Sequence, residues 1–470
     1  MLISRWELWL LALIVILSLA IRIYRLGTFP DTVLADEADN VQTAARILLG
    51  HPPANGFFGL DWTQQPAFSA YKQALFLRWF GFTVIALRLP SAVISALALI
   101  PFYLILRRQF SRISSLGATI LLSTNVWYLN FSRSGWNCID AAFYMLSAMV
   151  FLLLALDWVQ HSSRGKKWGW LFFCAAGVSC ALGLYGYPAG RAITVALLAF
   201  FPLALAYLRH HRRAIAGGFA ALFMVEAILF APQAAYVAGH WQLFNGRTGT
   251  VAIINDPAFR ADPVGTMWQQ LGRNLRGPWD GSVNRAPQYS PTGEPQLNRL
   301  AGALALAGML LSIFSACLRN MPETWLWWLM LLTGWGTTQL LTVGTPNGAR
   351  GIGYMPTLFY FVAAALDWFL QTARVLGREH RGRRLAEPIV AGIAVLVILA
   401  TGVLDVRHYA SWQSEPATRQ ARYLYLTTQE FPRWATRISE IATSNGGVTN
   451  LSQWRQIYPI PDPSNPIDNP

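Results

Sequence analysis

Apolar runs of about 20 residues recur along this 470-residue chain and alternate with short polar loops. A helix of that length crosses a hydrocarbon core of roughly 30 Å, and it satisfies its own backbone hydrogen bonds in lipid. The pattern therefore predicts an all-α polytopic membrane protein. We expect about eleven spans, near residues 8–24, 87–106, 113–131, 137–158, 168–186, 192–208, 214–238, 299–317, 323–343, 352–371 and 387–405.

Two long loops lie between the predicted spans. The first loop, about 25–86, carries apolar side chains at helical spacing, which predicts interfacial helices over 37–49 and about 66–80. The second loop, about 239–298, is rich in Gly, Pro, Asn, Arg and Trp and shows no sustained periodicity. The second loop therefore offers no prediction of particular helices.

The distribution of charge orients the spans. Hydrophobic residues make up 54% of the chain and charged residues 13%, with a formal net charge of +14. The basic residues gather in short loops between spans, so we expect a membrane protein with no nucleic-acid partner. One set of loops holds Arg107, Arg108, Arg112, Arg164, Lys166, Lys167, Arg209, Arg212, Arg213, Arg319, Arg374, Arg378, Arg381, Arg383 and Arg384. The short loops between them hold only Arg133, Arg191 and Arg350.

The positive-inside rule places the first set of loops in the cytoplasm. The N-terminus is then cytoplasmic, the first span is an uncleaved signal anchor, and the long loops and the C-terminus are extracytoplasmic. We expect a multi-pass protein of the inner or plasma membrane. It has one transmembrane domain over 1–405 and a short extracytoplasmic C-terminal segment over 406–470.

Three carboxylates crowd one short segment of the first outer loop, namely Asp36, Glu37 and Asp39. One interpretation is structural, because Asp36 is placed to cap the helix over 37–49 and acids in a first helical turn gain from its dipole. The other is catalytic, because a desolvated carboxylate beside like charge has a raised pKa and becomes a better general base. The sequence thus offers Asp36 as a base, with Glu37 beside it.

Four basic side chains on outer segments are candidates for binding a phosphate, namely Arg133, Arg350, Lys72 and Arg247. Arg350 lies in the glycine-rich turn 344–353, where unhindered backbone N–H groups, a helix start and a guanidinium together suit an anion. Arg133 begins an outer turn between two spans. The alternative for Arg133 is contact with lipid phosphate, and the alternative for Arg350 is a loop side chain that faces solvent.

No metal site is predicted. The four cysteines fall inside spans without ligand spacing, and the histidines are scattered. Paired carboxylates such as Asp36 and Glu37 can hold a divalent ion, but the sequence shows no clear third ligand. Glu226, inside the seventh predicted span, is either a functional acid or a neutral, hydrogen-bonded structural one.

A base and phosphate-binding cations on one side of a bilayer are what group transfer from a lipid-linked phosphate requires, because the phosphate leaves without an acid catalyst. Several motifs carry a resemblance to a known family, namely Asp36-Glu37-Ala38, Gln65-Pro66, Trp79-Phe80-Gly81, Leu87 to Ala92, Phe131-Ser132-Arg133, Tyr185 to Pro188, and Pro346 to Pro356. With these motifs the chain resembles the polyprenyl- and dolichyl-phosphate-sugar glycosyltransferases of the protein O-mannosyltransferase and aminoarabinose-transferase type, which have the GT-C fold. The Asp-Glu motif is the specific part of this resemblance.

The resemblance implies inverting transfer of a hexosyl or pentosyl group from a polyprenyl-phosphate donor to a hydroxyl of a protein, lipid or glycan. It implies that Asp36 is the base and that Glu37 helps to hold the base or the acceptor. The chain departs from many relatives at Gln65, where they carry Lys or His, so Lys72 or Arg350 is expected to meet the donor phosphate.

Two other functions stay open at this point. A membrane polysaccharide ligase or polymerase also uses a large outer loop and arginines, but does not depend on an acidic pair after the first span. A transporter or flippase of lipid-linked sugars is expected to carry inverted repeats and interrupted spans, and this sequence shows neither.

Overall fold

The computed structural model describes residues 4–48, 50, 52–61, 64–161, 166–284, 286–319, 322–379, 386–423 and 426–427, and within them the chain is helical almost throughout. The helices are α1 Arg5–Ile23, α2 Ala35–Leu48, α3 Phe68–Phe80, α4 Val84–Leu97, α5 Leu99–Leu106, α6 Arg112–Thr124, α7 Val126–Ser132, α8 Asp140–His161, α9 Lys166–Tyr185, α10 Arg191–Tyr207, α11 Arg212–Gly239, α12 Trp241–Val251, α13 Pro257–Ala261, α14 Pro263–Arg276, α15 Arg299–Arg319, α16 Pro322–Trp335, α17 Gly348–Gly351, α18 Met355–Glu379, α19 Ala386–Ser414 and α20 Pro416–Tyr423. The strands are β1 Thr32–Val33 and β2 Leu426–Thr427.

Each predicted span falls on one helix or on consecutive helices. By length and apolar composition, seven helical segments in the described part of the chain are able to cross a membrane, and α9 and α15 contain shorter apolar stretches. The prediction of a helical, polytopic membrane protein is therefore confirmed. The count of eleven spans stays a prediction.

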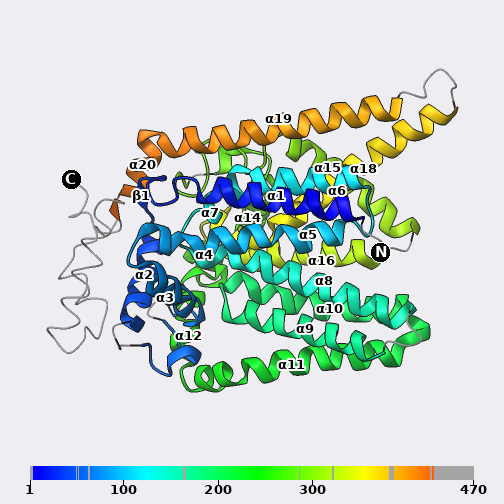
Figure 1. Cartoon of the computed structure of the whole chain (residues 1–470). Helices are drawn as coiled ribbons and strands as arrows, with labels where there is room; N and C mark the ends of the chain where they lie inside the picture. The colour runs from blue at the N-terminus through cyan, green and yellow to red at the C-terminus, as the bar shows by residue number, and fades with distance from the viewer. Residues whose placement is uncertain are drawn as a thin grey trace.

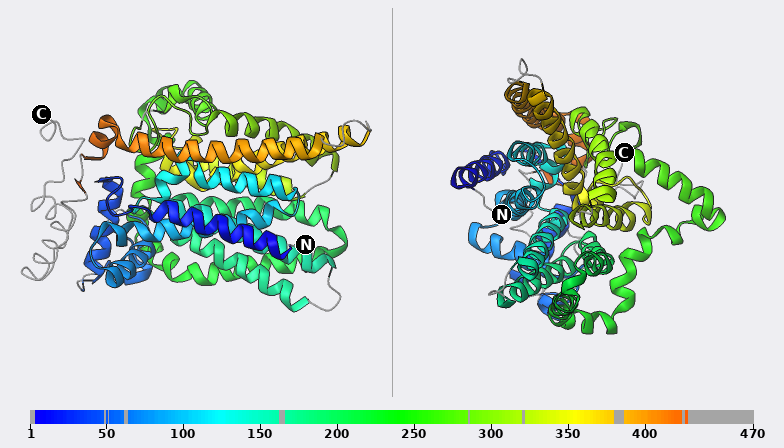
Figure 2. Two further views of the ribbon diagram at one scale, coloured as in Figure 1. Left: turned by 45° about the horizontal axis from the view of Figure 1, so that its top comes forward. Right: turned by 90° about the vertical axis from the view of Figure 1, so that its right-hand side faces the viewer.

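The long helices lie side by side in one bundle, with α2, α3, α20 and β1 gathered at one end (Figure 1). The N-terminus and the connection from α10 to α11 lie at the opposite end. The end-on view in Figure 2 shows α12 to α14 projecting from the side of the bundle, in green. The segments between the first two predicted spans thus form a cap over one end of the bundle.

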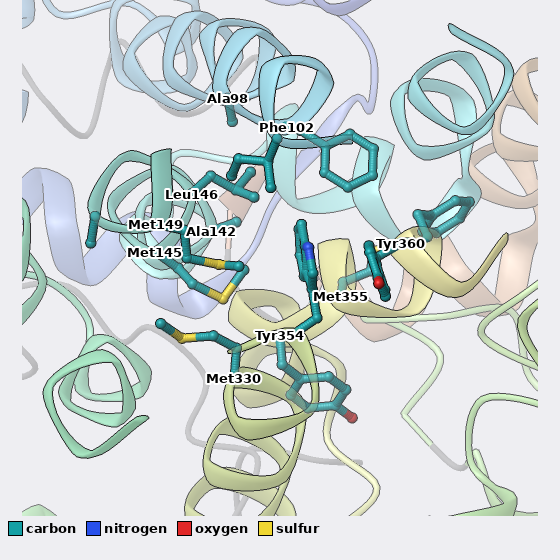
Figure 3. Close-up of a cluster of buried hydrophobic side chains, with 14 of the residues drawn as sticks. Ala98, Phe102, Ala142, Met145, Leu146, Met149, Met330, Tyr354, Met355 and Tyr360 are labelled. Atoms are coloured by element: carbon teal, nitrogen blue, oxygen red, sulfur yellow. The ribbon is translucent and has the colours of Figure 1, made fainter. Parts of the chain in front are cut away.

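The centre of the bundle is an apolar core that α8 and α18 cross. In the apolar windows of these two helices 83% of the residues are buried, against 22% for α1 and 17% for α19. The outer helices therefore turn most of their side chains to the surroundings, which suits lipid contact. Figure 3 shows the packing of core side chains from α5, α8, α16 and α18 and from the residues just before α5 and α18. Among them are Ala98, Phe102, Ala142, Met145, Leu146, Met149, Met330, Tyr354, Met355 and Tyr360.

The first outer loop contains the two predicted interfacial helices, with one correction. The helix expected over 37–49 is α2, and it begins at Ala35. Asp36 therefore lies inside the first turn and is not the N-cap. The second expected helix is α3, whose apolar face packs with α2 against the end of the bundle.

The second long loop, in which no sustained periodicity was expected, contains α12, α13 and α14. In α14 the polar side chains of Gln270 and Asn274 are buried, whereas Val264 and Trp268 are 80% and 74% exposed. The helix therefore turns polar side chains to the protein and apolar ones outward, with the two kinds segregated at helical spacing. The expectation that this loop lacks sustained periodicity is wrong for this segment. Asp262 caps α14 by accepting a hydrogen bond from the backbone N–H of Gly265.

The end of the described chain returns to the first outer loop. Helix α19 runs unbroken through the predicted domain boundary at residue 405, and β2 pairs antiparallel with β1, with Thr427 opposite Thr32. The residues after 427 lie outside the described part of the chain.

Candidate active site

Glu37 anchors the first turn of α2 in the protein interior. Its Oε1 and Oε2 accept hydrogen bonds from Nε and NH2 of Arg88 at 3.1 and 3.2 Å, and both side chains are fully buried. The backbone N–H groups of Leu34 and Gly135 donate to the same carboxylate. Burial alone would raise the pKa of Glu37, but the charges of Arg88 and Arg422 and these hydrogen bonds lower it. Glu37 is therefore held as a carboxylate with both oxygens occupied.

The turn after Arg133 holds α2 and α3 in place. The carbonyl of Gly135 accepts hydrogen bonds from Asn40 of α2 and Gln73 of α3, at 3.0 and 2.9 Å. A Cβ at residue 135 would lie 2.4 Å from Cγ of Leu87, so the close approach of this turn to α4 requires glycine. One buried turn thus fixes both helices of the cap.

Asp36, next to Glu37, has a different environment. Its side chain is partly exposed, and the hydroxyl of Tyr289 donates to its Oδ2 at 3.4 Å. The Tyr289 ring packs against Phe131 and Trp136, with ring centroids 6.0 and 5.7 Å apart. Asp36 is thus a partly exposed carboxylate in the first turn of a helix, beside an aromatic wall.

A second acid lies close to this wall. Asp140 begins α8, its side chain is fully buried, and it forms an ion pair with Lys72 of α3. The carboxylates of Asp36 and Asp140 both act electrostatically on Cys138, which places both acids near that residue. The structure therefore brings Asp36 and Lys72, two predicted site residues, to the same end of the bundle.

Arg350 reaches this region through the turn before α18. Its backbone N–H donates to the Asn347 side chain, and its guanidinium donates to the carbonyl of Val343 at 2.7 Å. A Cβ at Gly348 would lie 3.3 Å from Cβ of Tyr289, so this turn packs against the residue that contacts Asp36. The pocket beside Arg350 has a volume of about 10 Å³, room for a single water.

The buried polar face of α14 holds the segment that leads to Arg350. The amide of Asn274 donates to the Gln339 carbonyl and to the Thr345 hydroxyl, at 3.2 and 2.9 Å. Gln270 donates to the same two groups and to the carbonyl of Thr342. The second outer loop therefore positions the turn that carries Arg350.

The other two predicted phosphate ligands have different positions. Arg133 is 3% exposed, and its guanidinium donates to four backbone carbonyls that close the connection after α1, those of Ile21, Arg22, Tyr24 and Phe29. This geometry points to a structural role for Arg133 rather than to phosphate binding. Arg247 falls on α12, and its side chain lies outside the described side chains.

Two acids of this site are paired with cations. Glu37 pairs with Arg88 and Asp140 with Lys72. Among the residues that the structure describes, no group of three His, Cys, Asp or Glu side chains lies close enough together to hold an ion.

Sequence reasoning missed Asp140, Tyr289 and Arg88. Asp140 was detectable as an acid at the outer end of the predicted span 137–158, and Lys72 as a cation without an assigned counter-ion. Tyr289 lies in a loop without periodicity, so its place beside Asp36 had no sequence signal.

Comparison with known proteins agrees with the family resemblance of the sequence. The sequence model of the dolichyl-phosphate-mannose-protein mannosyltransferase family matches residues 64–237. An undecaprenyl phosphate-alpha-4-amino-4-deoxy-L-arabinose arabinosyl transferase of Pseudomonas aeruginosa is 26% identical over 398 residues, which cover 81% of this chain and 67% of that protein.

Two solved structures share the fold. ArnT from Cupriavidus metallidurans, bound to undecaprenyl phosphate, superposes with a TM-score of 0.51 at 15% identity, covering 88% of this chain and 75% of ArnT. The oligosaccharyltransferase AglB from Archaeoglobus fulgidus, in complex with an inhibitory peptide and a dolichol-phosphate, has a TM-score of 0.57 at 17% identity. That match covers 87% of this chain, which spans only 56% of the archaeal protein's length.

The helical bundle, capped at one end by the loop that carries Asp36 and Glu37, has the fold of membrane glycosyltransferases. With the family match over residues 64–237 and the arabinosyl transferase relative, the predicted resemblance is confirmed: the chain is similar to the lipid-phosphate-sugar glycosyltransferases of the GT-C type.

Proposed function

We propose that this protein transfers a sugar from a polyprenyl-phosphate donor to a hydroxyl acceptor, with inversion at the anomeric carbon. The observation that carries the proposal is the contrast between two adjacent acids. Glu37 has both oxygens occupied by Arg88 and backbone N–H groups, whereas Asp36 is partly exposed beside Tyr289. The partly exposed carboxylate of Asp36 is therefore the proposed base, and the fully buried Glu37 positions it.

The proposed step balances without a further reagent. Asp36 takes the proton of the acceptor hydroxyl as its oxygen forms a bond to the anomeric carbon. The bond from that carbon to the donor phosphate oxygen breaks, and its electron pair leaves with the polyprenyl phosphate. Attack from the face opposite the leaving group inverts the anomeric centre.

The leaving phosphate requires positive charge, and Lys72 is the best-placed cation. Its ammonium pairs with Asp140, whose charge, like that of Asp36, acts on Cys138. A donor phosphate would share this ammonium with Asp140, and the developing charge would be stabilised in a site of low dielectric constant. Arg350, held by the turn that packs on Tyr289, is the second phosphate ligand once its narrow pocket opens.

The proposal includes the topology expected from the charge distribution. Eleven spans place the cap formed by α2 and α3, and with it Asp36, on the extracytoplasmic side. The donor then reaches the site from the outer leaflet. The names of the relatives support this donor class, because ArnT is seen with undecaprenyl phosphate and the archaeal neighbour with a dolichol-phosphate and a peptide. The acceptor hydroxyl belongs to a protein, a lipid or a glycan.

A thermal stability experiment with the purified protein tests the donor class. A ligand present at 100 times its Kd stabilises the folded state by about 2.7 kcal/mol. We expect a rise in Tm with one polyprenyl-phosphate sugar and no rise with the matching sugar nucleotide. The rise should become smaller in Lys72→Arg, which keeps the charge but changes its geometry. Stabilisation by the sugar nucleotide alone would contradict the proposal.

A further inference from the structure

A pocket of about 580 Å³ lies at the end of the bundle opposite the candidate active site. It opens between the end of α8, the start of α9 and the turn Arg209–His211 that leads into α11. Its volume is in the range of sites that hold small molecules or lipid head groups. None of its lining residues belongs to the site around Asp36, and the proposed sugar transfer does not use them.

The lining of this pocket combines aromatic and cationic side chains. Three rings, those of Trp158, Trp170 and Phe173, form one side. A Cβ at Gly217 would lie 2.8 Å from Cη2 of Trp170, so glycine lets this ring lie directly on the backbone of α11. Trp170 is still 46% exposed, and its free face is available to a ligand. The other side of the pocket is the basic turn, with Arg209, His210, His211, Arg212 and Arg213.

The positive charge of the turn is not neutralised within the described chain. Asp157 and Glu323 form ion pairs with Arg108. Arg212 donates to the carbonyl of Leu205, which closes the turn. Arg209 and Arg213, in contrast, form no ion pair with any residue that the structure describes, and both are exposed. A concave site with aromatic walls and two uncompensated guanidinium groups suits an anion that also carries apolar surface.

We propose that this pocket binds the phosphate-bearing head group of an anionic membrane lipid. Arg209 and Arg213 would bind the phosphate, and the Trp170 ring would pack against the glycerol and the first carbons of the acyl chains. The position supports a lipid over a soluble anion, because the pocket lies where membrane-crossing helices end and basic pockets of this kind meet the lipid head groups. The bound lipid would hold the junction of α10 and α11 at the bilayer surface.

Binding of short-chain lipids to the full-length protein in detergent tests this proposal. The probes are dihexanoyl phosphatidylglycerol, dihexanoyl phosphatidylcholine, glycerol 1-phosphate and inorganic phosphate. We expect phosphatidylglycerol to bind more tightly than the other three. The double variant Arg209→Ala–Arg213→Ala should weaken its binding by about 25-fold, or roughly fivefold for each arginine near an anionic lipid surface.

Two further variants separate a built site from general surface charge. Arg78→Ala–Arg407→Ala removes the same charge from exposed positions on α3 and α19, and it should leave the affinity unchanged. Trp170→Ala should weaken phosphatidylglycerol binding but not the weak binding of glycerol 1-phosphate. An equal loss in both double variants would overturn the proposal, as would the absence of a preference for the anionic lipid. If inorganic phosphate bound as tightly as the lipid, the ligand would be a soluble anion and the lipid assignment would be wrong.

Discussion

Glu37 and Arg88, which lie on α2 and α4, form a fully buried ion pair with two hydrogen bonds. The other N–H groups of Arg88 bind the carbonyls of Leu26, Pro30 and Thr32. This one pair therefore joins the connection after α1, the cap and the bundle. The acid next to it, Asp36, owes its position to this junction.

Replacement of Glu37 should destabilise the whole cap. Glu37→Gln leaves the Arg88 guanidinium buried without a counter-charge, and the loss of one partner of a buried pair costs about 3–5 kcal/mol. We expect a large fall in Tm for the purified protein. The matched control is Glu294→Gln, which breaks an exposed pair with His408 and should change stability by at most about 1 kcal/mol. Equal melting temperatures for the two variants would show that the buried pair does not anchor the cap.

The contribution of Glu37 to the stability of the folded protein should fall as the pH falls. Because the pKa of Glu37 is lowered in the folded state, the unfolded chain binds the proton more readily. The stabilisation is then complete above the unfolded pKa of about 4.3 and is lost as the pH falls through the lower folded value. The difference in Tm between the wild type and Glu37→Gln should stay constant from neutral pH to about 4.3 and shrink below it. A difference that grows on acidification would contradict the assignment.

Asp36→Asn should abolish sugar transfer without unfolding the protein. The amide keeps the shape and the contact with Tyr289 but cannot accept a proton, and loss of a general base lowers the rate by about 10²–10⁴-fold. The measurement is release of polyprenyl phosphate from the donor that stabilises the protein. Asp31→Asn is the matched control, because Asp31 lies in the same loop and pairs with Arg419 at the surface. Near-full activity of Asp36→Asn would exclude the proposed mechanism.

The pair of Lys72 and Asp140 allows stability and activity to be separated. Lys72→Met leaves the Asp140 carboxylate buried and unpaired, so it should lower both Tm and activity. In Lys72→Met–Asp140→Asn the unpaired charge is removed as well. We expect this double variant to recover most of the lost Tm but none of the activity, because the phosphate still lacks its cation. Recovery of activity with stability would mean that Lys72 only balances the charge of Asp140.

The sequence was sufficient to predict the helices and to find the acidic motif, because both depend on local patterns. The eleven apolar runs all fall on helices, and the amphipathic stripe of α2 was visible in Val41, Ala44 and Ala45, which are buried. The partners of the acids were not visible. Glu37 meets Arg88 and Asp36 meets Tyr289 only through tertiary packing, across large separations in sequence. Helix α14 was missed although its apolar and polar residues segregate at helical spacing, because it lies in a loop rich in Gly and Pro.

Arg133 is the residue for which the structure differs most clearly from the expectation based on the sequence. The outer turn predicted a ligand for the donor phosphate, but the guanidinium donates to four carbonyls around the connection after α1. Lysine cannot reproduce this planar set of donors, so Arg133→Lys should leave several buried carbonyls unpaired, each at a cost of about 1–3 kcal/mol. We expect a marked fall in Tm at an unchanged KM for the donor. The opposite result, an unchanged Tm with a raised donor KM, would return Arg133 to the phosphate site.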